Sequence, residues 1–205
     1  MTALFISAFV TFLVVIDPPG CAPIFAGLTK DAAAAQRRAM AIRSVLVAAG
    51  ILLFFALLGE DLLSALGVSL SAFRIAGGIM LFLIAIDMVF EKRTERRENR
   101  AEAVAARDVE DVSVFPMAIP MIAGPGSIAS AMLLTARAEG VAETAAVLGA
   151  LAATLLLTLL ALLAAGPLMR LLGHKMEAMI TRLLGVILAA LAVQFVIDGI
   201  ERSFG

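Results

Sequence analysis

The stretch Asp17-Pro18-Pro19-Gly20 interrupts an apolar segment that runs from Ala3 to Leu28. Two prolines and a glycine cannot continue a helix smoothly, because proline lacks the backbone N–H and glycine loses the most conformational freedom on folding. An aspartate inside a membrane segment is energetically costly and indicates a function. A second interruption, Gly124-Pro125-Gly126-Ser127, lies in a later apolar segment. These two interruptions predict two broken helices.

The composition is that of a membrane protein. The chain has 205 residues, 62% of them hydrophobic, with a mean hydropathy of +1.04. Because soluble domains are about 45–50% apolar, we predict an all-α polytopic protein whose surrounding partner is the lipid bilayer. The net charge of −1 does not indicate a nucleic-acid partner.

The small number of cysteine and histidine residues limits the kinds of site that the chain can form. One cysteine and one histidine exclude a disulfide within the chain and argue against the usual metal sites, so we expect no metal and no cofactor. The chain contains no nucleotide-binding pattern of the form GxxxxGK[ST], so the sequence does not encode ATP drive.

Six segments have the length that a membrane-crossing helix needs, about 20 mainly apolar residues. Between the third and the fourth lies 91–111, which is dense in both signs of charge and which we interpret as a solvated cytoplasmic linker without chemistry. His174 falls in a predicted polar loop, Gly166–Arg182. The six segments are Ala3–Leu28, Ala39–Leu58, Ala72–Phe90, Val112–Leu134, Thr144–Ala165 and Ile180–Ile200.

The distribution of Lys and Arg predicts the orientation. Thirteen of the 16 basic residues lie in the first, third and fifth connections. The positive-inside rule then places these connections in the cytoplasm and both termini outside, in the periplasm. If the two broken segments turned back as re-entrant hairpins, four crossings would remain. Twelve basic residues would then lie on one side of the membrane and four on the other. Because this division is less uneven than 13 against 3, six crossings are favoured.

The chain also resembles itself at a shift of about half its length. Pro19-Gly20 matches Pro125-Gly126 at a shift of 106 residues, and Arg74-x-x-Gly77 matches Arg182-x-x-Gly185 at 108. We predict two three-helix repeats, 1–90 and 112–205, joined by the linker 91–111. Because three is odd, the repeats are inverted in the membrane, and the first helix of each is broken, as in many secondary transporters.

The two breaks predict a binding site. Asp17 is a strong N-cap residue and Pro18 suits the first helical position; Gly124 and Pro125 repeat that arrangement. A helix N-terminus presents unpaired N–H groups and about half a positive charge, which favours a carboxylate. The alternative is that the breaks only kink the helices for packing. The predicted substrate-binding residues are Asp17, Pro18, Pro19, Gly20, Cys21, Gly124, Pro125, Gly126, Ser127 and Gln194.

Other residues receive structural interpretations. Gln194 is deep enough in the sixth segment to line a cavity, whereas Asp87 is interpreted as interfacial. Arg74 and Arg182 begin the third and sixth segments, where a basic side chain usually extends toward the headgroups. The pair Gly77-Gly78 and the spacing Gly185-x3-Ala189 predict close helix packing. Pro116 and Pro120 predict an irregular approach to the second break.

Three motifs carry a family resemblance that covers nearly the whole chain. They are Asp17-Pro-Pro-Gly-x-x-Pro-Ile-Phe25, Phe73-Arg-Ile-Ala-Gly-Gly-Ile79 and Pro116-x-Ala-Ile-Pro-x-Ile-Ala-Gly-Pro-Gly-Ser127. Together they resemble the MarC family (UPF0056) of bacterial integral membrane proteins. The family commonly has Asn directly after the first motif's glycine, where this chain has Cys21. A thiol is a poor substitute for an amide that would bind a ligand or an ion.

The resemblance implies an inner-membrane protein with six helices, grouped with the LysE-type exporters, and some members are similar to transporters of small neutral amino acids. We therefore expect a secondary transporter of a small solute, with a proton or sodium ion as the coupling partner. A non-transporting regulatory or assembly protein is the alternative. An enzyme is not expected, because Ser127 has no histidine within the membrane to activate it.

Overall fold

A computed structural model describes residues 2–92, 95–97, 99 and 111–204. Every regular element in these ranges is a helix, which confirms the all-α prediction. The elements are α1 (Thr2–Ile16), α2 (Pro18–Leu28), α3 (Ala34–Ala65), α4 (Leu70–Val89), η1 (Ser113–Ile122), α6 (Pro125–Thr135), α7 (Val141–Leu163) and α8 (Ala165–Phe204).

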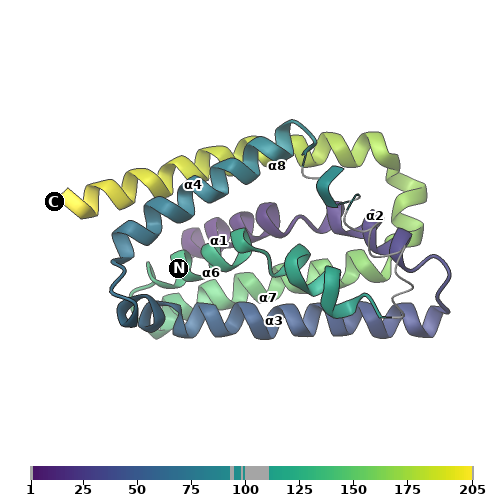
Figure 1. Cartoon of the computed structure of the whole chain (residues 1–205), viewed down its shortest axis with the longest axis horizontal. Helices are drawn as coiled ribbons and strands as arrows, with labels where there is room; N and C mark the ends of the chain where they lie inside the picture. The colour runs from purple at the N-terminus through teal and green to yellow at the C-terminus, as the bar shows by residue number, and fades with distance from the viewer. Residues whose placement is uncertain (1, 93–94, 98, 100–110, 205) are drawn as a thin grey trace.

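Five helical stretches among the described residues are long and apolar enough to cross a membrane, and a bent pair makes a sixth. α1 and α2 together form one of the five, Thr2–Leu28, whereas η1 and α6 meet at an angle of 54°. In Figure 1, α2 continues from α1 toward the right-hand end, and α6 continues from η1 toward the left-hand end. Both termini lie at the left-hand end, the arrangement that six crossings require.

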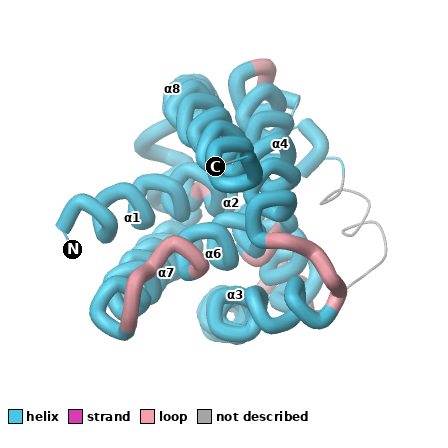
Figure 2. Tube along the Cα trace, turned by 90° about the vertical axis from the view of Figure 1, so that its left-hand side faces the viewer, coloured by secondary structure: helices cyan, strands magenta, loops and turns pink. Residues whose placement is uncertain are grey.

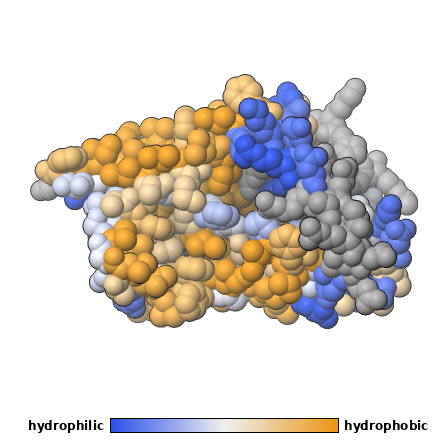
Figure 3. All heavy atoms as spheres, in the orientation of Figure 1, coloured by the Kyte–Doolittle hydropathy of each residue, from blue (hydrophilic) through white to orange (hydrophobic). Residues whose placement is uncertain are grey.

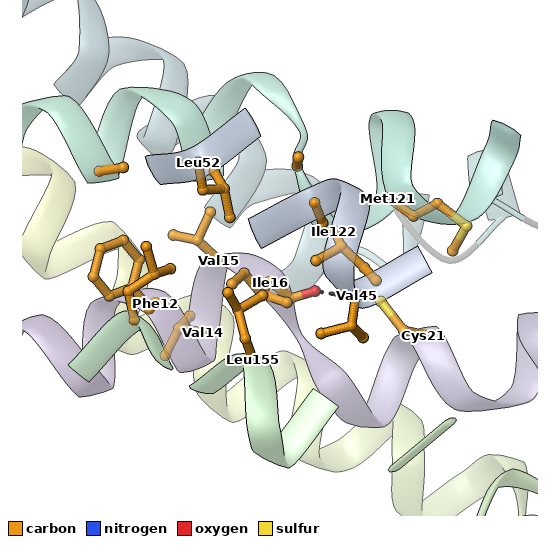
Figure 4. Packing of buried hydrophobic residues seen from close by; sticks show 14 of the residues in the cluster. Phe12, Val14, Val15, Ile16, Cys21, Val45, Leu52, Met121, Ile122 and Leu155 are labelled. Carbon is orange, nitrogen blue, oxygen red and sulfur yellow. Dashed lines mark hydrogen bonds between the residues drawn. The ribbon is translucent and has the colours of Figure 1, made fainter. Parts of the chain in front are cut away.

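The two short half-helices lie inside the bundle. Viewed from one end, α2 and α6 occupy the middle, and the longer helices surround them (Figure 2). Close-packed apolar side chains hold the breaks in place: Ile16 from the first break, Ile122 from the second and Val45 from α3 belong to one buried cluster (Figure 4). Both interruptions therefore lie inside the bundle, among buried apolar side chains.

The last helix corrects one prediction. Gly166–Arg182 was expected to be a loop, but α8 runs without interruption from Ala165 to Phe204. Pro167 falls in the first turn, where its missing N–H costs no helical hydrogen bond. The residues that follow are mostly good helix formers, so the polarity of this stretch does not require a loop. Figure 1 shows the first part of α8 crossing the right-hand end before the helix turns back along the bundle.

Glycines let α4 and α8 pack closely along much of their length (Figure 1). A Cβ atom at Gly78 would lie 2.8 Å from the carbonyl oxygen of Ala192, and one at Gly185 would lie 3.1 Å from that of Ala85. These contacts confirm the packing predicted for both glycines. The inverted relation between the two halves, and the division at 1–90, 91–111 and 112–205, stay predictions.

Candidate functional site

The first break is a helix start capped by its own aspartate. Asp17 has left-handed backbone angles (φ 58°, ψ 66°), a conformation that Asp and Asn adopt more readily than most residues. Its carboxylate accepts a hydrogen bond from the Gly20 N–H at 3.2 Å. Pro18 takes the first helical position, so the predicted capping arrangement is confirmed.

The second break follows an irregular segment. η1 is a π-type helix that contains Pro116 and Pro120, and Phe115 and Ile119 have extended backbone angles within it. Gly124 then occupies the cap position of α6 and Pro125 the first helical one. A Cβ atom at Gly124 would lie only 2.4 Å from the Pro120 carbonyl oxygen, so this sharp turn requires glycine.

Arg97 joins the two breaks. Its guanidinium lies 3.1 Å from the Asp17 carboxylate, and the two side chains are only 11% and 2% exposed. The same guanidinium donates to the carbonyl oxygens of Ile16, in the first break, and Met121, in the second, both at 3.5 Å. A bulky residue at Gly20 would obstruct this arrangement, because a Cβ atom there would lie 2.3 Å from Asp17 Oδ2.

A cavity of about 230 Å³ lies against the second break. Its walls include the first turn of α6, Val15 of α1, and the side chains of Asp87, Arg96 and Arg97. Asp87 and Arg96 form an ion pair at 2.5 Å. Two neighbouring arginines of the charged segment therefore each hold an aspartate of the membrane-spanning bundle at the edge of one cavity.

The structure brings four of the ten predicted site residues to the cavity and places a fifth beside it. Gly124, Pro125, Gly126 and Ser127 line the cavity, and Asp17 reaches it through Arg97. Cys21 is fully buried, and its thiol donates to the carbonyl oxygen of Ile16 (Figure 4). Pro18, Pro19 and Gly20 shape the first break and do not line this cavity.

Gln194 belongs to a different group of polar side chains. It is exposed and donates to Asp198 at 2.7 Å, and Asp198 also pairs with Arg137. Arg137 lies 4.4 Å from the ring centre of Phe195. Burial, together with the nearby charges of Arg74 and Arg202, lowers the pKa of Arg137 to about 10. This group lies at the other end of α4 from Asp87, so Gln194 does not line the cavity described above.

Arg74 corrects a second expectation. It was expected to extend toward the headgroups, yet it is only 1% exposed. One Nη donates to the carbonyl oxygen of Ala136 at 3.4 Å, and Nε–H has no hydrogen-bond partner. No carboxylate among the described residues lies within ion-pair distance of it. Arg74 is thus a buried charge with one weak contact.

The three charged residues that line the cavity were not predicted as site residues. Arg96 and Arg97 lie in the segment interpreted as a solvated linker, and Asp87 was interpreted as interfacial. The remaining positions of that segment, 93–94, 98 and 100–110, lie outside the described residues. Nothing in the local sequence distinguishes Arg97 from its basic neighbours, so only the folded arrangement reveals its role. Within the described part, no group of three or more His, Cys, Asp or Glu side chains could hold a metal ion.

Comparison with known proteins identifies relatives over the full length. The family described as MarC family integral membrane protein matches residues 2–204. A UPF0056 membrane protein of Methanocaldococcus jannaschii is 39% identical over 199 residues, which is 97% of each chain. The UPF0056 inner membrane protein YhgN of Escherichia coli is 35% identical over 200 residues, 96% of this chain and 95% of YhgN. YvbG of Bacillus subtilis, also a UPF0056 membrane protein, is 34% identical over the whole chain and 97% of its own length. No solved structure matches the chain.

Proposed function

The chain belongs to the MarC family of integral membrane proteins, and we propose that it is a secondary transporter of a small solute such as a neutral amino acid. The observation that carries this proposal is the Arg97 guanidinium, which contacts both helix breaks beside a cavity of about 230 Å³. That volume is on the order of several water molecules, which suits a small solute.

The cavity offers a place for a carboxylate. Helical hydrogen bonding in α6 begins with the Ile128 N–H, which donates to Gly124. The N–H groups of Gly126 and Ser127 precede it and have no helical acceptor. Ser127 adds a hydroxyl that makes no hydrogen bond to any described residue. With the positive end of the helix dipole and the guanidinium of Arg97, these donors favour an anionic group over a neutral one.

The ion pair gives a route to coupling. A solute carboxylate that binds Arg97 competes with Asp17 for the same guanidinium. Once released, the Asp17 carboxylate is a buried charge without its partner, and the coupling cation, a proton or a sodium ion, would take the place of Arg97. Solute binding and cation binding then favour each other, as coupled transport requires.

The proposed setting is the bacterial inner membrane, with both termini in the periplasm. The uneven distribution of Lys and Arg supports that orientation. YhgN, one of the relatives, is named an inner membrane protein. No catalytic role is proposed for Ser127. A regulatory or assembly protein, the alternative function, would have no need of a cavity beside a buried ion pair that contacts both helix breaks.

Uptake into proteoliposomes tests the proposal. Purified protein would be given labelled alanine or glycine with a proton gradient, a sodium gradient or neither. We expect gradient-dependent uptake that Asp17→Asn abolishes and that Asp61→Asn, at an exposed position of α3, leaves intact. If correctly inserted protein takes up no small amino acid under any gradient, this transport proposal is wrong.

A further inference from the structure

A second cavity lies apart from the helix breaks. It has a volume of about 260 Å³ and lies where the end of α2 meets the beginning of α3 and the α7–α8 junction. It shares no lining residue with the cavity at Gly124–Ser127. Its walls combine apolar side chains, among them Phe25, Leu162 and Leu163, with the side chains of Arg37 and Arg38. A ligand that fits both kinds of wall is amphipathic.

The two arginines have no partner of their own. Both are exposed, and no described residue forms a hydrogen bond or an ion pair with either guanidinium group. Arg43, about one and a half turns further along α3, is paired with Asp111. Two adjacent unpaired guanidinium groups favour a phosphate, whose oxygens accept the paired donors of arginine.

The apolar side of the cavity continues along the outside of α7. Leu162 is buried, whereas Leu163, Leu160 and Leu156 are 44%, 53% and 57% exposed. Residues spaced in this way lie along one face of a helix, so they form an apolar stripe that ends at the cavity. Figure 3 shows hydrophilic groups concentrated toward the right-hand part of the molecule, with apolar surface over most of the remainder of the visible face. This is the pattern of a bilayer-embedded body with one charged end.

We propose that this cavity binds the phosphate headgroup of an anionic phospholipid through Arg37 and Arg38, with an acyl chain along the outward face of α7. We favour the phosphate of a lipid over a free phosphate ion, because a free ion would make no contact with the apolar stripe. The distribution of Lys and Arg puts this end of the bundle in the cytoplasm, and the cytoplasmic leaflet is the one rich in anionic lipid. The inference does not depend on the transport proposal.

Native mass spectrometry of the full chain, released from mixed micelles, tests this site. The micelles would contain phosphatidylglycerol or phosphatidylcholine at equal concentrations. For the unmodified protein we expect roughly 30-fold tighter retention of phosphatidylglycerol, as two interfacial arginines would give. The double variant Arg37→Gln/Arg38→Gln should lose that selectivity. Arg43→Gln, which removes a paired arginine on the same helix, should keep it.

Two controls separate the other outcomes. Arg37→Lys/Arg38→Lys retains the charge and should retain most of the selectivity, which distinguishes lost binding from lost folding. Inorganic phosphate at the same concentration should not displace the lipid. Equal retention of phosphatidylglycerol by the unmodified protein and the double glutamine variant would overturn the proposal. Displacement by free phosphate would overturn it too, because the site would then recognise the ion without the lipid.

Discussion

Arg97 and Asp17 lie 80 positions apart in the chain, yet the guanidinium Nη1 lies 3.1 Å from the Asp17 carboxylate oxygen. Both side chains are almost completely buried. Because Arg97 also contacts the carbonyl oxygens of Ile16 and Met121, it stabilises both broken segments at once. A segment that was expected only to connect the two halves thus supplies a charge to the centre of the site.

Loss of Arg97 should destabilise the protein strongly. Removing one partner of a buried ion pair leaves an uncompensated charge, at a cost of about 3–5 kcal/mol. We expect Arg97→Gln to lower the free energy of unfolding by this amount, and Asp17→Asn/Arg97→Gln to recover part of it. Thermal unfolding in detergent would measure both. Arg96→Gln is the matched control, since its pair with Asp87 is 69% and 20% exposed and should contribute about 0–1 kcal/mol. Equal losses for Arg97→Gln and Arg96→Gln would refute the central role of Arg97.

Gly124 should not tolerate even a methyl group. A Cβ atom there would lie 2.4 Å from the Pro120 carbonyl oxygen, a backbone atom that cannot move alone. We expect Gly124→Ala to cost about 1–3 kcal/mol of stability. Gly27→Ala is the control: nothing lies within 4 Å of a Cβ atom at Gly27, and Ala in a helix is more stable than Gly by roughly 0.5–1 kcal/mol. Melting temperatures of the two variants should therefore move in opposite directions, and a shared direction would contradict the geometry of the second break.

Replacement of Arg74 should stabilise the protein. The side chain is a buried charge with an unsatisfied Nε–H and no carboxylate partner among the described residues. Exchanging such a charge for an apolar side chain of similar length is often stabilising, by about 1–4 kcal/mol. We expect Arg74→Met to raise the unfolding temperature and Lys30→Met, at an exposed position after α2, to leave it unchanged. A lower unfolding temperature for Arg74→Met would show that Arg74 has a charged partner in the folded protein.

The positions of the breaks could be predicted because proline and glycine act locally. Asp17-Pro18 and Gly124-Pro125 determine where α2 and α6 begin regardless of what surrounds them. The packing of Gly78 and Gly185 was predictable for a similar reason, since small residues in a membrane helix allow another backbone to approach.

The charged partners could not be predicted. Whether Arg97 lies in water or against Asp17 depends on the path of the chain, which local composition does not determine. The same holds for Gln194: its depth in the last helix was read from the sequence, but the direction it faces depends on how α8 packs on α4. Arg74 was expected to extend to the headgroups, but the fold buries it beside the carbonyl oxygen of Ala136.

Both chain ends should be accessible from outside the cell. In a Cys21→Ala background, Thr2→Cys and Ser203→Cys should react with a membrane-impermeant maleimide on intact cells. Ala33→Cys, exposed just before α3, should react only after the membrane is permeabilised, because the basic residues near it favour the cytoplasm. Labelling of Ala33→Cys on intact cells, with both termini protected, would reverse the predicted orientation.

The most direct test of the account is counterflow of labelled alanine in proteoliposomes, which needs no assumption about the coupling ion. Vesicles loaded with unlabelled alanine should transiently accumulate the labelled form when they contain the unmodified protein. Vesicles containing folded Asp17→Asn or Arg97→Gln should not. Transient accumulation that both variants match would contradict the role of the ion pair, and its absence from inserted, unmodified protein for every small amino acid would contradict the proposed transport.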